Sequence, residues 1–130
     1  MYILIKASDD SIAYRLFDNF NKALEYMYND MLKYQHVPIG IRNIDCLAKD
    51  EFKFVKMHSS AAAQLLTPTT HVAWNLENII LNKYAIVVFK NNNIKIKEFH
   101  TIDQMMKSYR TIKNNNAIII DLKAKRGANI

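Results

Sequence analysis

Apolar and polar residues alternate at the start of the chain and then recur at helical spacing. Residues 2–6 and 12–17 have the pattern of two strands joined by a polar turn. After Asn19, a favourable N-cap, apolar residues recur every three or four positions, which predicts a helix over 20–34. The segment 1–35 is therefore expected to form a hairpin followed by a helix that packs on it.

The same order of elements returns 82 positions later without a gap. Strands are predicted over 84–90 and 94–99, and a helix follows Thr101, which fits a capping box with Gln104. Identity between the two segments is low, so a duplication is not proved. The pattern nevertheless predicts that 83–113 is a second hairpin–helix unit.

The rest of the chain adds further strands. Residues 51–57 alternate, and 72–76 alternate in a way that favours a strand over a short helix. The alanine-rich segment 60–66 is compatible with a helix and equally with a strand of small residues. The apolar run within 117–122 is typical of a central strand that is covered on both faces.

Together these elements predict an α+β fold. We expect a mostly antiparallel sheet built from two hairpin–helix (ββα) units, with two main helices packed on it. The chain is expected to form a single domain over 1–122, followed by a basic flexible tail over 123–130.

The composition excludes several classes of function. Half of the 130 residues are apolar, which is enough for a core. Two glycines cannot supply a glycine-rich phosphate loop, and the single Cys46 excludes an internal disulfide and a multi-cysteine zinc site. We therefore expect neither a cofactor nor a metal. No apolar run is long enough to cross a membrane and the start lacks a signal peptide, so a cytoplasmic location is expected if the chain is complete.

Positive charge is concentrated in the second half of the chain. The formal net charge is +6, and residues 1–65 carry eight basic and eight acidic side chains, whereas 66–130 carry ten and four. This asymmetry points to nucleic acid or another anionic ligand, although ordinary solvated lysines explain it too. Lys95 and Lys97 share one face of their predicted strand. The candidate anion-binding residues are Lys90, Lys95, Lys97, Lys107, Arg110, Lys113, Lys123, Lys125 and Arg126.

Aromatic residues of the first predicted helix indicate a second kind of surface. Tyr26, Tyr28 and Tyr34 cannot all point to one side of a helix, so at least one is expected to be exposed or covered by another chain. These three are the candidate interface residues of a homodimer or of a complex with a protein partner. Trp74, the single tryptophan, is expected in the core rather than in a pocket.

Catalytic chemistry has little support in the sequence. His58-Ser59-Ser60 resembles one half of the paired His-x-Ser/Thr motif of RNA-ligase-like phosphoesterases, but neither His71 nor His100 supplies the second half. Positioned acid–base pairs are also missing, so no catalytic residue is assigned and a non-enzymatic protein is expected. If the protein is an enzyme, these three histidines are its acid–base candidates.

The leading hypothesis is a non-enzymatic binding or regulatory protein that meets an anionic partner with its basic second half. This protein is expected to be an accessory or counter-defence factor of a virus or mobile element. Its Ile-, Asn-, Lys- and Tyr-rich usage suggests an AT-rich genome of the host or mobile element. The alternative is a protein–protein interaction module or inhibitor that acts as a homodimer. A phosphoesterase-like enzyme comes third.

Overall fold

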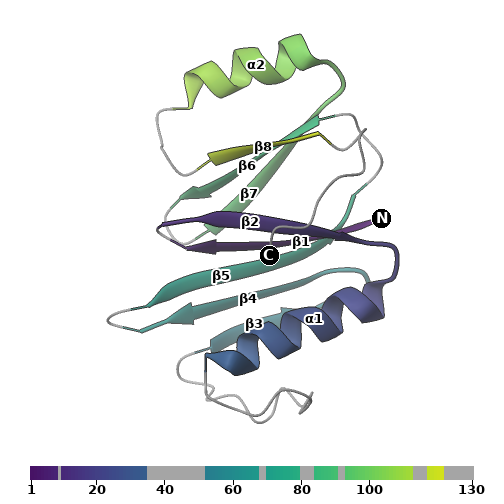
Figure 1. Ribbon diagram of the computed structural model, residues 1–130, viewed down its shortest axis with the longest axis vertical. Coiled ribbons are helices and arrows are strands. Elements are labelled where there is room, and N and C mark those ends of the chain that lie inside the picture. Colours follow the sequence, from purple (N-terminus) through teal and green to yellow (C-terminus); the bar gives the residue numbers. More distant parts are fainter. Residues whose placement is uncertain are drawn as a thin grey trace.

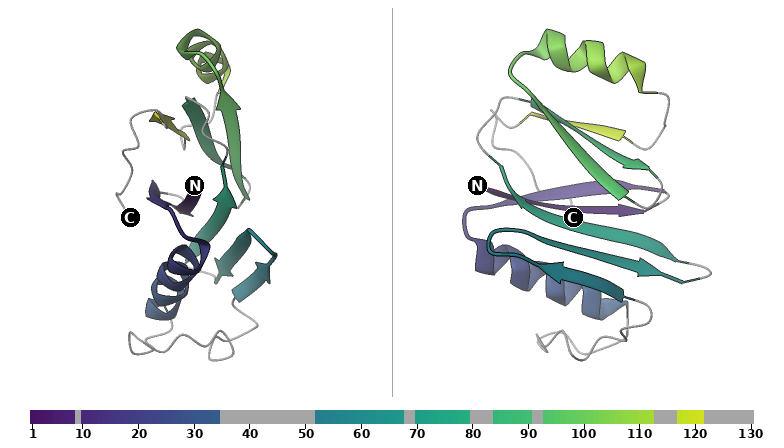
Figure 2. Two further views of the ribbon diagram at one scale, coloured as in Figure 1. Left: turned by 90° about the vertical axis from the view of Figure 1, so that its right-hand side faces the viewer. Right: turned by 180° about the vertical axis from the view of Figure 1, so that it is seen from behind.

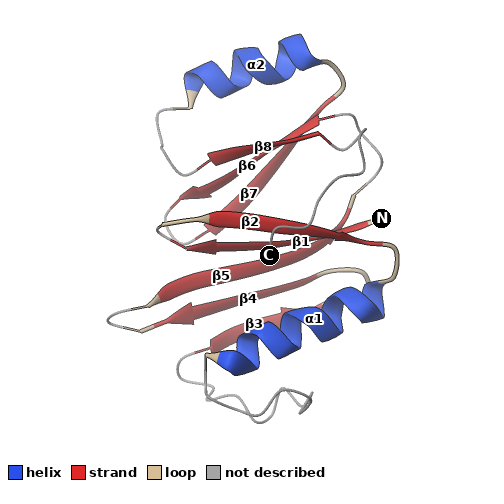
Figure 3. Ribbon diagram, in the orientation of Figure 1, coloured by secondary structure: helices blue, strands red, loops and turns tan. Residues whose placement is uncertain are grey.

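The computed structural model describes residues 1–8, 10–34, 52–67, 70–79, 84–90, 93–112 and 117–121. Within these residues, eight strands form two antiparallel sheets and two helices cover them (Figures 1 and 3). Sheet A has the strand order β2-β1-β5-β4-β3, and sheet B has the order β7-β6-β8. The elements are β1 (Tyr2–Ser8), β2 (Ile12–Phe17), α1 (Phe20–Lys33), β3 (Phe52–Lys56), β4 (Ala61–Leu66), β5 (His71–Asn78), β6 (Tyr84–Lys90), β7 (Asn93–Phe99), α2 (Ile102–Thr111) and β8 (Ala117–Asp121).

Helix α1 closes one face of sheet A. Its first turn is capped by Asn19, whose side chain accepts a hydrogen bond from the Lys22 backbone N–H. Its apolar stripe then packs on inward-facing residues of the strands, so that Met27 and Met31 meet Trp74 in one buried cluster. This layer is the larger of the two main cores.

Sheet B packs against the other face of sheet A. On β1, Leu4 belongs to the α1 side, while Ile3 and Ile5 point the opposite way and pack with Val87 of β6 and Ile120 of β8. The layers therefore follow one another as α1, sheet A, sheet B and α2 (Figures 1 and 2). Strand β1 is covered on both faces because it lies between the two main cores.

Helix α2 lies on the outer face of sheet B but covers only part of it. Thr101 caps the helix by accepting a hydrogen bond from the Gln104 backbone N–H, as the capping-box pattern predicts. Met105 is the one helix residue that is buried, and it packs on Ile86 and Phe99. The part of this sheet face that lies away from Phe99 stays open.

The predicted architecture of two hairpin–helix units in one sheet is wrong. Strands hold 56% of the described residues, and they form two separate sheets. The first hairpin gains β5, β4 and β3 as further strands, whereas the second hairpin gains β8. The two hairpins meet through apolar side chains of their faces and share no ladder of backbone hydrogen bonds.

Two of the local predictions are settled by the strand assignments. The alanine-rich segment is extended, as strand β4, and the preference for a strand at residues 72–76 is confirmed by β5. The expectation that 117–122 holds a central strand is wrong, because β8 lies at an edge of sheet B and β6 is central. Cys46 and the basic tail 123–130 lie outside the described residues.

Candidate anion-binding site

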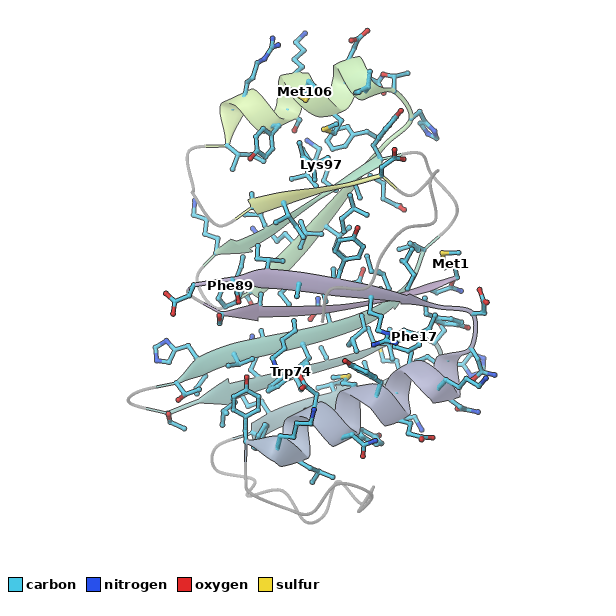
Figure 4. The ribbon with its side chains drawn as sticks, in the orientation of Figure 1. Met1, Phe17, Trp74, Phe89, Lys97 and Met106 are labelled. Carbon is cyan, nitrogen blue, oxygen red and sulfur yellow. The ribbon has the colours of Figure 1, made fainter. Side chains whose placement is uncertain are left out.

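A groove of about 770 Å³ opens between the outer face of sheet B and the second half of α2. Figure 4 shows Lys97 in the layer between the strands of sheet B and α2. The groove combines positive charge, hydroxyl groups and an aliphatic floor. Its lining residues are Ile86, Val88, Lys90, Lys95, Lys97, Ser108, Thr111 and Ile112.

Strand alternation places three lysines in this groove. In the antiparallel pairing of β6 with β7, Lys95 lies opposite Val88 and Lys97 lies opposite Ile86. All four side chains therefore point to the same face, and Lys90 follows Val88 two positions later on that face. Helix α2 rests at the Phe99 end, so the lysine end of the face is left uncovered.

The three lysines place like charge on one face of the β6–β7 pair, and the Lys97 ammonium lies 5.6 Å from the Phe99 ring centroid. Lys95 and Lys97 are two residues apart on one strand, which separates their Cα atoms by roughly 7 Å, and Lys90 is a diagonal neighbour of Lys95. In the described part of the chain, none of the three lysines forms an ion pair. Two unit charges roughly 7 Å apart repel by about 0.6 kcal/mol in water, and by more beside apolar walls. Lys95 therefore repels both of its neighbours, whereas Lys90 and Lys97 are farther apart. An anion that enters the groove relieves this repulsion.

Helix α2 adds two hydroxyl groups to the wall opposite the lysines. The Thr111 hydroxyl donates to the Ser108 carbonyl oxygen at 2.7 Å, so its own oxygen remains able to accept a hydrogen bond. These residues belong to the last turns of α2, where carbonyl groups carry partial negative charge. Complementing that charge is the alternative role of the lysines, and the experiments below separate the two roles.

The nine predicted anion-binding residues do not form one group in the structure. Lys90, Lys95 and Lys97 line the groove. Lys107 and Arg110 are exposed on α2 and do not line the groove, although Lys107 lies one helical turn before the groove-lining Thr111. The remaining four residues lie outside the described part of the chain: Lys113, Lys123, Lys125 and Arg126.

The three candidate interface tyrosines pack on neighbouring rings. The ring of Tyr26 lies 5.7 Å from that of Phe17. Tyr28 lies 5.4 Å from Phe54, and burial raises the pKa of its hydroxyl. Tyr34 is the most exposed of the three, at 37%, although its edge meets a core ring. Their role in binding another chain stays a prediction.

The structure contains a buried polar cluster beneath α1 that was not predicted from the sequence. Trp74 is fully buried, as expected of a core residue, and its indole Nε1 donates to the Asp30 carboxylate at 2.9 Å. The Lys6 ammonium lies 2.9 Å from the same oxygen and 5.0 Å from the Tyr34 ring centroid. Burial alone would lower the Lys6 pKa, but its contacts with Asp30 and Tyr34 outweigh burial and raise that pKa. One signal was available, because Asp30 stands three residues after Met27 on the apolar stripe.

This buried cluster stabilises the core between α1 and sheet A and is not a ligand site. Its one carboxylate, at 8% exposure, is already shared by the indole and the ammonium group. A buried charge that has both partners in place needs no further ligand.

The three candidate histidines lie at separate places in the fold. His58 is exposed between β3 and β4, and His71 begins β5 at the opposite end of β4. His100 is exposed between β7 and α2. Among the described residues, no group of three His, Cys, Asp or Glu side chains is arranged to hold a metal ion.

Within the described residues, neither helix combines the length and the apolar character that crossing a bilayer requires. No protein-family model, curated protein or solved structure matches this chain.

Proposed function

We propose that this chain is a non-enzymatic binding protein that takes an anionic ligand into the groove between sheet B and α2. One observation carries the proposal: three lysines converge on one open sheet face, and in the described part of the chain no carboxylate pairs with them. Phosphate groups, free or in a nucleic acid, are the anions that such a set of lysines favours. A cytoplasmic location is part of the same proposal.

The groove supplies the three contributions that anion binding requires. The ammonium groups of Lys95 and Lys97 attract the charge, and the Ser108 hydroxyl in the lining can donate a hydrogen bond. The aliphatic floor at Val88 excludes water from one side of the ion, which strengthens each electrostatic contact. Binding also removes the mutual repulsion of the lysines, so the free energy gained exceeds that of a single surface contact.

Charge reversal in the groove is the direct test. The Lys95→Glu/Lys97→Glu variant should bind tripolyphosphate and a short single-stranded oligonucleotide roughly tenfold to a hundredfold more weakly in calorimetric titrations, because each charge-assisted contact contributes about 1.5–3 kcal/mol before screening. The slope of log affinity against log salt for the oligonucleotide should fall by about two, one for each lost lysine.

A matched control separates the groove from net charge. Lys22→Glu/Lys56→Glu makes the same change in net charge at two exposed lysines, one on α1 and one on β3. This variant should retain most of the affinity of the unmodified protein. Equal losses of affinity in the two double variants would mean that the groove lysines act only through net charge, and this result would overturn the proposal.

A second candidate function is self-association through the open part of sheet A. Sheet B covers the β1 and β2 side of that face, and the β3 side exposes Val55 at 59% and Met57 at 63%. Lys53 and Glu77 carry opposite charges on the same face, which a two-fold symmetric contact can pair between copies.

Sedimentation velocity over a range of concentrations tests this candidate. Val55→Ser/Met57→Ser should abolish a dimer that the unmodified protein forms, while Ile102→Ser, at an exposed apolar position on α2, should leave that dimer intact. A chain that sediments as a monomer at all concentrations would rule the candidate out.

A further inference from the structure

The groove has a lining that is unusual for a surface that tracks a nucleic acid. Its charged residues gather in one concave place, and the exposed Lys107 and Arg110 of α2 are not part of its lining. None of its described lining residues is aromatic, so it offers no ring on which a base can stack. Single-stranded nucleic acids are bound in general by a basic track combined with such rings.

The apolar part of the groove points to a ligand with two kinds of surface. The half-buried Val88 forms the floor together with the buried Ile86, and the half-buried Ile112 adds an aliphatic wall directly after α2. Lys95 and Lys97 stand opposite the two floor residues across the β6–β7 ladder. A ligand in contact with both strands therefore meets charge on one side and hydrocarbon on the other.

From this juxtaposition, and resting on the proposed anion binding, we infer that the ligand is a compact phosphate ester with an aliphatic body. The phosphate group lies among Lys90, Lys95 and Lys97, and the aliphatic body lies on Val88 and Ile112. The volume of about 770 Å³ is within the range of pockets that hold small molecules. The groove thus selects for a small amphipathic anion rather than a polymer.

A series of alkyl phosphates tests the inference on the unmodified protein. Inorganic phosphate and butyl, hexyl and octyl phosphate are titrated by calorimetry at one salt concentration. Affinity should rise by about threefold to fourfold for each methylene group that is buried, until the floor is covered. An affinity that does not change with chain length overturns the inference, because the apolar floor then contributes nothing.

Two variants locate the aliphatic body. Ile112→Ser should weaken hexyl phosphate by about tenfold and leave inorganic phosphate unchanged, since it removes hydrocarbon and no charge. Ile102→Ser, at the other end of the same helix and outside the groove, should change neither affinity. If Ile112→Ser fails to fold, the chain-length series still decides the question.

Competition separates the failure of this inference from the failure of the proposed function. A short oligonucleotide that displaces hexyl phosphate and binds more tightly, with affinity lost in Lys95→Glu/Lys97→Glu, overturns the compact ligand and keeps the anion-binding groove. Hexanoate that binds as tightly as hexyl phosphate also overturns the phosphate ester and keeps the groove. If Lys95→Glu/Lys97→Glu binds these anions as tightly as the unmodified protein does, both the inferred ligand and the anion-binding groove are overturned.

Discussion

The two helices cover their sheets to very different extents. Helix α1 has 14 residues and buries six of them, including a carboxylate with two partners, whereas α2 has 10 residues and buries only Met105. The α1 side is a filled layer in which polar groups satisfy one another. The α2 side leaves exposed lysines beside half-buried aliphatic residues in a groove. The comparison teaches that the first layer serves stability, while the second has side chains available for a ligand.

The largest expected effect comes from equivalent core truncations on the two sides. Met27→Ala should lower the free energy of unfolding by about 3–4 kcal/mol, because Met27 is enclosed by the larger core. Met105→Ala should lower it by about 2 kcal/mol, because the α2 layer is thinner and its cavity can collapse. Urea denaturation measures both. Losses of equal size would break the comparison.

The next effect concerns the buried carboxylate. Asp30→Ala should lower the free energy of unfolding by about 2–4 kcal/mol, since it leaves the Lys6 ammonium and the Trp74 N–H without their acceptor. Asp103→Ala, at an exposed position in the first turn of α2, should cost less than about 1 kcal/mol. Thermal unfolding of the two variants provides the measurement. A loss of stability in Asp30→Ala as small as that in Asp103→Ala would mean that the Lys6–Asp30 pair is solvated.

Alkaline pH should weaken the α1 side specifically. The pKa of Lys6 is raised above 10.5, so its contribution is complete below that value and is lost as pH rises through the folded-state pKa. Burial raises the pKa of Tyr28 above 10.0, which has the same sign because ionising the buried phenol is disfavoured. Unfolding free energies measured from about pH 9 upward should therefore decline. In Lys6→Met, the free energy of unfolding should decline less with rising pH. An unchanged decline would mean that other groups cause the loss of stability.

The smallest effect is expected in the groove. Lys95→Gln should raise the free energy of unfolding by a few tenths of a kcal/mol at low salt, because it relieves repulsion from two neighbouring lysines. The gain should disappear at high salt. A clear loss of stability in this variant would instead assign the lysines to complementing the carbonyl end of α2.

The sequence predicted the local elements better than their assembly. The helix predicted over 20–34 is observed as Phe20–Lys33, and the strand predicted over 84–90 is observed over the same residues. Hydrophobic periodicity determines such elements because it is a local property. The pairing of β1 with β5 joins residues about seventy positions apart, and no local pattern specifies it. The consecutive buried residues Ile3, Leu4 and Ile5 were the available sign that β1 would be covered on both faces.

The candidate site was predictable in part for the same reason. Alternation was sufficient to place Lys95 and Lys97 on one face of their strand, as the register of β6 and β7 confirms. The open groove depends on how far α2 reaches over sheet B, which is a property of tertiary packing. Lys107 and Arg110 had the same appearance in the sequence, and only the position of α2 separates them from the groove.

The double-sided burial of β1 has a consequence for how the chain is made. Synthesis proceeds from the N-terminus, so Ile3 and Ile5 leave the ribosome long before β6 and β8, which cover them. A fragment that ends after β5 holds every strand of sheet A and still presents these isoleucines to water. Until β6 and β8 have been synthesised, the growing chain therefore exposes an apolar sheet face that favours aggregation. Its solubility during that time depends on what else covers this face.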